Sequence, residues 1–148
     1  MTDKIIHVKV HPAVKKYLES HNTVTKDGII LKDKLTKEEI LCYVSIKGKK
    51  IPSKISKKLE SFPQTNILVN DWNFFQFGYE IEPYWQYRLS KRLYMRMMEE
   101  IATRIEIYTA KSMTKMQAVE DYYNENNITY EELNPSTVIK HYQRHFQK

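Results

Sequence analysis

The sequence predicts an α+β protein, with a small N-terminal unit of strands and helices followed by a helical C-terminal bundle. Residues 5–10 (IIHVKV) place Ile6, Val8 and Val10 on one side, which is the period of a half-buried strand. From Pro83 onward the chain has no glycine, and its apolar residues recur at helical spacing. The 148 residues, 41% of them hydrophobic, suit one core or two closely packed subdomains, which we place at 1–82 and 83–148.

A helix and a second short strand should follow the first strand. Pro12 suits the first turn of a helix in which Val14, Tyr17 and Leu18 share one face. Residues 28–32 (GIILK) have the composition of a short strand. The N-terminal unit therefore begins as strand, helix, strand.

Thr36 and Glu39 have the spacing of a capping box, which predicts a helix that begins at Lys37 and ends near Gly48. The single cysteine, Cys42, lies among apolar residues of this helix, so we expect it in the core as a small hydrophobe. One cysteine forms no internal disulfide, which favours a reducing compartment.

The stretch 47–58 (KGKKIPSKISKK) holds six lysines and no acid, and its Gly, Pro and Ser predict a loop followed by a short helix. Lys49 and Lys50 are candidates for phosphate contacts, and the alternative is a solvated lysine-rich loop. Further on, residues 72–81 alternate as an aromatic strand after a turn at 70–71, which predicts a hairpin.

Residues 84–111 predict one long helix. Its apolar face is expected to contain Tyr87, Tyr94, Met98, Ile101, Ile105 and Tyr108. Arg88, Arg92 and Arg96 form a stripe on the other side, which we interpret as a solvated face in which Arg96 pairs with Glu100. The alternative is a second contact to phosphates.

Capping signals divide the rest of the chain into further helices. Thr114 with Gln117 opens a helix whose apolar face holds Met116, Val119, Tyr122 and Tyr123. Thr129 with Glu132 predicts a one-turn helix. Asn134, followed by Pro135, caps the last helix.

The last helix has a basic face and no carboxylate. Residues 134–148 contain no Asp or Glu, whereas 120–132 contain five acids and no Lys or Arg. Val138, Ile139, Tyr142 and Phe146 share the apolar arc. The candidate nucleic-acid-binding residues are Ser136, Thr137, Lys140, His141, Gln143, Arg144 and Lys148, together with Lys49 and Lys50. The alternative is that the cations only complement the helix dipole.

A helix, a tight turn at 126–129, a single helical turn and a basic amphipathic helix together form the outline of a helix-turn-helix. The segment 113–148 has a residue pattern formed by Ala118, Val119, Tyr122, Ile128 and the Tyr142–Arg144 pair. In this pattern it resembles the C-terminal module of small phage and mobile-element proteins of the Bacteroides group. That module is similar to the helix-turn-helix of the Mor family of phage transcription activators. The resemblance implies a mobile-element DNA-binding regulator.

Charge and composition agree with a polyanionic partner. The net charge of +6 and pI near 9.2 favour nucleic acid over an anionic membrane. The helix-turn-helix outline makes double-stranded DNA the expected partner. We expect a cytoplasmic protein, because no apolar run approaches a membrane span and the N-terminus lacks a signal peptide's apolar core.

With three glycines, no nucleophile elbow and no activated cysteine, an enzyme is unsupported, and no cofactor is expected. His141 and His145 have zinc-ligand spacing but lack the glutamate of a zinc protease, so no metal is expected.

A second hypothesis is a phage virion or connector protein, with a structural or assembly role and a place in the virion. The aromatic stretch 72–81 would then be its contact surface, and it would also allow the N-terminal half to form a homo-oligomer or bind a protein partner.

Overall fold

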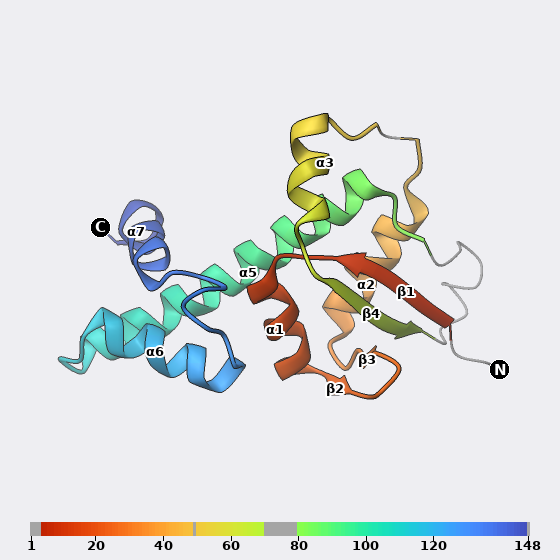
Figure 1. Ribbon diagram of the computed structural model, residues 1–148. Coiled ribbons are helices and arrows are strands. Elements are labelled where there is room, and N and C mark those ends of the chain that lie inside the picture. Colours follow the sequence, from red (N-terminus) through yellow and green to blue (C-terminus); the bar gives the residue numbers. More distant parts are fainter. Residues whose placement is uncertain (1–3, 49, 70–79, 148) are drawn as a thin grey trace.

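The computed structural model describes residues 4–48, 50–69 and 80–147 (Figure 1). It confirms the α+β class, because a small sheet in the N-terminal half is followed by a mostly helical remainder. The buried apolar side chains of both halves form one continuous cluster.

Within the described residues, the sheet has four strands in the order β1-β4-β3-β2. Strand β1 (Lys4–Lys9) pairs antiparallel with β4 (Gln64–Val69), so that Ile6 lies opposite Ile67. β3 (Ile29–Ile30) is parallel to β4, and β2 (Thr23–Val24) is antiparallel to β3. The predicted alternation is confirmed, because Ile6, Val8 and Val10 are all buried. β3 lies within the predicted second strand, and its close approach to β4 requires Gly28, where a Cβ would lie 2.7 Å from the backbone oxygen of Asn66.

Helix α1 (Pro12–His21) begins at the predicted proline, and it buries Val14, Tyr17 and Leu18 as expected. Helix α2 (Lys34–Ser45) begins earlier than predicted and ends before Gly48. The proposed capping box of Thr36 and Glu39 is wrong, because the carboxylate of Asp33 caps the helix by accepting the amides of Leu35 (3.1 Å) and Thr36 (3.3 Å).

The middle of the N-terminal half differs from the prediction at Cys42 and at the lysine-rich stretch. Cys42 is exposed, not in the core, because α2 buries Thr36, Ile40 and Val44, and Cys42 lies off that face. Helix α3 (Ser53–Glu60) begins inside the stretch that we predicted as a lysine-rich loop. The predicted aromatic strand falls mainly on residues 70–79, which lie outside the described residues.

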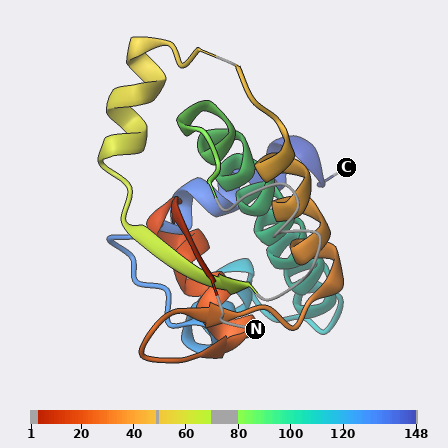
Figure 2. The same cartoon turned by 90° about the vertical axis from the view of Figure 1, so that its right-hand side faces the viewer.

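Helix α5 (Pro83–Ala110) is 28 residues long and runs through the whole molecule (Figure 1). It contacts β1, α1, α2, α3, α6 and α7. Figure 2 shows α2 and α3 on opposite flanks of α5. The predicted apolar face is correct for Met98, Ile101 and Ile105, whereas its three tyrosines are only half-buried. Leu89, Leu93 and Met97 complete the buried side.

Two hydrogen bonds hold α5 against the start of the chain. The backbone amide of Lys9 donates to the Gln86 side chain at 2.9 Å, and the amide of His11 donates to Ser90 Oγ at 2.8 Å. α5 also contacts β1 and α1, so the start of the chain packs against this helix.

The C-terminal helices begin where the capping signals predict. α6 (Lys115–Asn126) has the Thr114–Gln117 capping box, and α7 (Pro135–His145) has Asn134 as its N-cap. Thr129 and Glu132 also form a reciprocal box, since each accepts the other's backbone amide. However, the segment 130–132 is a turn, not the helix that we predicted.

The arginine stripe of α5 is not simply a solvated face. Arg96 pairs with Glu39 of α2 and donates to Thr36 Oγ1 at 2.9 Å, whereas the predicted pair with Glu100 does not form. Arg92 reaches the same Glu39 oxygen at 3.2 Å. The Arg96 side chain is only 19% exposed and that of Glu39 only 10%, so α2 is held to α5 by a shielded ion cluster.

Replacement of Glu39 by alanine should therefore leave the Arg96 guanidinium half-buried and without its main partner. We expect a loss of about 2 kcal/mol in the free energy of unfolding, between the values typical of surface and fully buried pairs. Glu38→Ala is the matched control, because Glu38 forms only an exposed pair with Lys34 at 3.9 Å. Its cost should be at most about 0.5 kcal/mol. Urea denaturation measures both, and equal losses would contradict the role given to Glu39.

Candidate nucleic-acid interface

Helix α7 is attached to the rest of the protein through one side only. Val138 and Tyr142 are buried, and Ile139 and Phe146 are half-buried against the core cluster. Asn134 Oδ1 accepts the amide of Ser136 at 2.9 Å and so closes the first turn. Phe146 is less buried than Val138 and Tyr142 of the same apolar arc, because it is the C-cap residue and its backbone has left the helical conformation.

The opposite side of α7 faces solvent. Five of the candidate residues are exposed there: Ser136, Thr137, Lys140, Gln143 and Arg144. We call these five residues the basic face of α7. Among the described residues, no carboxylate forms an ion pair with Lys140 or Arg144.

The structure does not bring the remaining candidates onto this face. His141 is half-buried at its edge, with its ring 4.5 Å from that of His145. Burial and the neighbouring His145 lower the pKa of His141. Lys50 is exposed, but it lies in the segment between α2 and α3, at the opposite end of the molecule from α7 (Figure 1). Lys49 and Lys148 lie outside the described residues.

Three of the five acids of residues 120–132 have partners on α1 or α5. Arg104 of α5 binds both carboxylate oxygens of Glu125, at 3.0 and 2.7 Å, and this hydrogen bonding lowers the pKa of Glu125. Tyr108 donates to Asp121 at 2.6 Å. Lys16 of α1 lies 3.7 Å from Glu132. The abrupt change of charge along the sequence thus becomes a separation in space, with acids tied to α1 and α5 and cations exposed on α7.

The connection between α6 and α7 spans residues 127–134 and is longer than the three- or four-residue turn of a helix-turn-helix. Asn127 ends α6 in the left-handed conformation, with φ of 56°. The Tyr123 hydroxyl donates to the backbone oxygen of Leu133 at 2.8 Å, which holds the end of the connection close to α6. α7 begins at the predicted Pro135, but the single helical turn of the expected outline is replaced by a non-helical connection.

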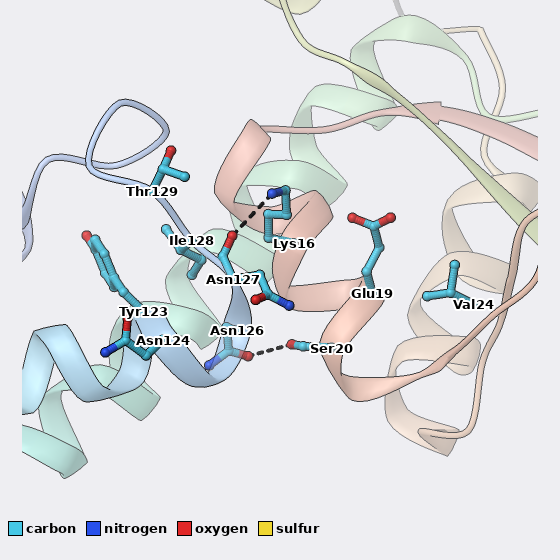
Figure 3. A pocket seen from close by; sticks show the side chains of 10 residues that line it. All are labelled: Lys16, Glu19, Ser20, Val24, Tyr123, Asn124, Asn126, Asn127, Ile128 and Thr129. Atoms are coloured by element: carbon cyan, nitrogen blue, oxygen red, sulfur yellow. Dashed lines mark hydrogen bonds between the residues drawn. The ribbon is translucent and has the colours of Figure 1, made fainter.

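A groove of about 740 Å³ lies between α1 and the end of α6 (Figure 3). Figure 3 shows Lys16 and Ser20 of α1 directed at the opposite wall. Lys16 Nζ donates to the backbone oxygen of Asn127 at 3.2 Å, and Ser20 Oγ donates to Asn126 Oδ1 at 2.5 Å. Because these polar groups already satisfy one another, the groove is a joint between the two halves.

A polar cluster that the sequence analysis missed lies beside this joint. The Tyr17 hydroxyl donates to Glu100 at 2.5 Å, and His21 Nε2 lies 3.6 Å from the same carboxylate. The nearby Glu100 carboxylate raises the pKa of His21 against the opposing effect of burial, and Asp33 adds to the increase. Burial alone would raise the pKa of Glu100, but hydrogen bonds from His21 and Tyr17 outweigh it and the net shift is downward.

Comparisons with known proteins add no relative: no protein-family model, curated protein or solved structure matches the chain. In the described part of the chain, no helix is both long enough and apolar enough to cross a bilayer. Over the same residues, no group of three or more His, Cys, Asp or Glu side chains is arranged to hold a metal ion.

The Tyr17, His21 and Glu100 cluster predicts a pH dependence of stability. The folded state raises the pKa of His21, so its contribution is complete below the unfolded value of 6.5 and is lost as pH rises through the folded value. The unfolding free energy of the wild type should therefore fall between about pH 6 and about pH 8, as His21 loses its proton. In Glu100→Gln this fall should be smaller. Glu99→Gln, at the exposed neighbour, should leave that decrease unchanged. Urea unfolding across this range tests the pair, and identical pH profiles for the two variants would contradict the assignment.

The two sides of α7 should respond differently to substitution. Tyr142→Ala should cost about 3 kcal/mol, because a buried ring is removed, and Phe146→Ala only about 1–2 kcal/mol at a half-buried chain end. Lys140→Ala and Arg144→Ala should each change stability by no more than about 0.5 kcal/mol. Thermal melts provide the comparison. If the two cation variants melt as early as Tyr142→Ala, the basic face supports the fold.

Proposed function

We propose that this protein binds double-stranded DNA through the basic face of α7 and acts as a non-enzymatic regulator. The observation that carries the proposal is the side-on attachment of α7: its apolar side is buried, while Lys140 and Arg144 are exposed and have no carboxylate partner among the described residues. Free cations on an anchored helix are suited to phosphates, since no internal ion pair has to be broken first.

The polar residues of the same face supply the other contacts that such an interface needs. Ser136, Thr137 and Gln143 carry hydroxyl or amide groups that can hydrogen-bond to base edges, while lysine and arginine neutralise phosphates. α7 has 11 residues and is therefore about 16 Å long. An α-helix with its side chains is about 10–12 Å across, which fits the major groove of about 12 Å width.

The regulatory role rests on the resemblance of residues 113–148 to modules of phage and mobile-element regulators. The longer connection at 127–134 is a difference from the usual helix-turn-helix, so DNA contact is assigned to α7 itself and not to the whole motif. The contact surface of the virion hypothesis falls largely outside the described residues, and it remains a hypothesis from the sequence.

The salt dependence of duplex binding tests the proposal. Wild-type protein should bind a labelled duplex at about 50 mM salt and much more weakly at about 200 mM, because bound phosphates release counterions. Replacement of both Lys140 and Arg144 by glutamine should weaken binding at low salt and reduce the slope of log K against log salt by roughly 2, about 0.9 for each lost contact. Fluorescence anisotropy gives both quantities.

The control is Lys26→Gln with Lys32→Gln, which removes the same charge from exposed positions on either side of β3. This double variant should keep a slope close to that of the wild type. The proposal is wrong if the wild type does not bind duplex at low salt, or if the two double variants weaken binding equally.

A further inference from the structure

A second basic surface lies between α3 and α5, far along α5 from its end next to α6. It is a groove of about 370 Å³, which we call the α3–α5 groove. Its walls hold four aromatic rings and two lysines: His11, Phe62, Tyr87, Tyr94, Lys58 and Lys91. In Figure 1, α3 and α7 lie on the same upper side of α5, with α3 near its start.

The aromatic wall of the groove is held in place by the core. The His11 ring lies 5.1 Å from the ring of Tyr94 and 5.7 Å from that of Phe62. His11 itself is fixed on both sides, because its amide donates to Ser90 Oγ at 2.8 Å and its Nδ1 accepts the amide of Ala13 at 3.0 Å. The wall is thus formed before any ligand arrives, which reduces the entropy lost on binding.

The imidazole of His11 also supplies a hydrogen-bond donor to the groove. Because Nδ1 accepts an amide proton, the neutral ring carries its proton on Nε2. Burial, with a smaller effect of Lys58, lowers the pKa of His11 and keeps the ring neutral. Among the described residues, no partner accepts the Nε2 proton.

The lysines give the groove its charge. Lys91 is exposed on α5, and Lys58 Nζ lies 5.9 Å from the ring centre of Tyr87. Neither lysine has an ion-pair partner among the described residues. Lys54 and Lys57 continue the positive charge along α3, and both are exposed. Cations beside accessible rings are the combination with which proteins hold unpaired nucleotides.

We propose that the α3–α5 groove binds a nucleotide, with the base against the aromatic wall and the phosphate between Lys58 and Lys91. The assignment stands on the groove's own residues and does not depend on DNA binding by α7. A purely apolar ligand would leave two lysines unused, and a simple anion would leave the rings unused. A base joined to a phosphate uses both. The same chemistry is present in a single strand and in a free mononucleotide, and the row of lysines on α3 favours the strand.

Binding of a labelled thymidine oligonucleotide of about ten residues, measured by fluorescence anisotropy at low salt, tests the inference. Tyr87→Leu should weaken binding roughly five-fold or more through loss of stacking, and Lys91→Gln should weaken it and lower its salt dependence. The matched controls are Tyr130→Leu and Lys111→Gln, exposed residues at the other end of the molecule. Both controls should bind like the wild type. Lys91 is exposed, so its variant tests the groove even if Tyr87→Leu melts early.

An abasic strand of equal length separates stacking from charge. It should bind the wild type several-fold more weakly than the thymidine strand, and Tyr87→Leu should not weaken it further. Competition by thymidine monophosphate then identifies the source: displacement at micromolar concentration indicates a free nucleotide as the ligand, and displacement only at millimolar concentration indicates a strand.

The inference is overturned if Tyr87→Leu and Lys91→Gln both bind the oligonucleotide like the wild type, or if the abasic strand binds as tightly as the thymidine strand. If single-strand binding is lost when Lys140 and Arg144 are replaced, but not when the groove residues are replaced, the inference is overturned and the proposed function stands. Conversely, duplex binding that is insensitive to Lys140 and Arg144 would remove the proposed function without affecting the groove.

Discussion

The structure depends on covering the apolar side of α5 along its whole length. A helix of 28 residues is about 42 Å long, more than either half of the chain covers alone. The sheet and α1 to α3 contact its first part, and α6 and α7 cover the rest. Leu89 and Leu93 on one side of its midpoint and Ile101 and Ile105 on the other belong to the same buried cluster. Folding of the two halves is therefore coupled through one helix, since loss of either cover would expose apolar surface.

Polar contacts fix how the elements meet, and they also determine the charge of the surface. Glu39, Glu125 and Glu132 are each paired with a cation from a different element of the fold. Apolar packing allows a small set of angles between helices, and these pairs add a directional contact between the elements they join. Because these carboxylates are paired with cations of the scaffold, unpaired positive charge remains on other surfaces, which include α3 and α7. The positions of the acidic residues thus determine both which elements are joined by ion pairs and which surfaces keep a positive charge.

Features encoded within a few residues were predictable from the sequence. The alternation at 5–10, the capping box at Thr114 and the cap at Asn134 depend only on neighbours, as does the exposed face of α7. The misses depend on partners distant in sequence or on a competing local cap. Arg96 has Glu100 one turn away but pairs with Glu39, and Asp33 displaces Thr36 as the cap of α2. The α3–α5 groove unites segments that periodicity treats separately, so no local pattern could have indicated it.

The continuity of α5 has a geometric consequence for the two basic surfaces. Each residue of an α-helix turns the chain by about 100° and advances it by about 1.5 Å. One residue inserted near the middle of α5 would therefore swing α6 and α7 more than a quarter turn around the axis relative to α3. A change of length in the connection at 127–134 would not rotate α7 in this way, because contacts with α5 and α6 hold α7 in place. The length of α5 thus fixes the angle between α3 and the pair α6 and α7 around the helix axis. Natural variation in chain length should therefore occur in the loops and not in this helix.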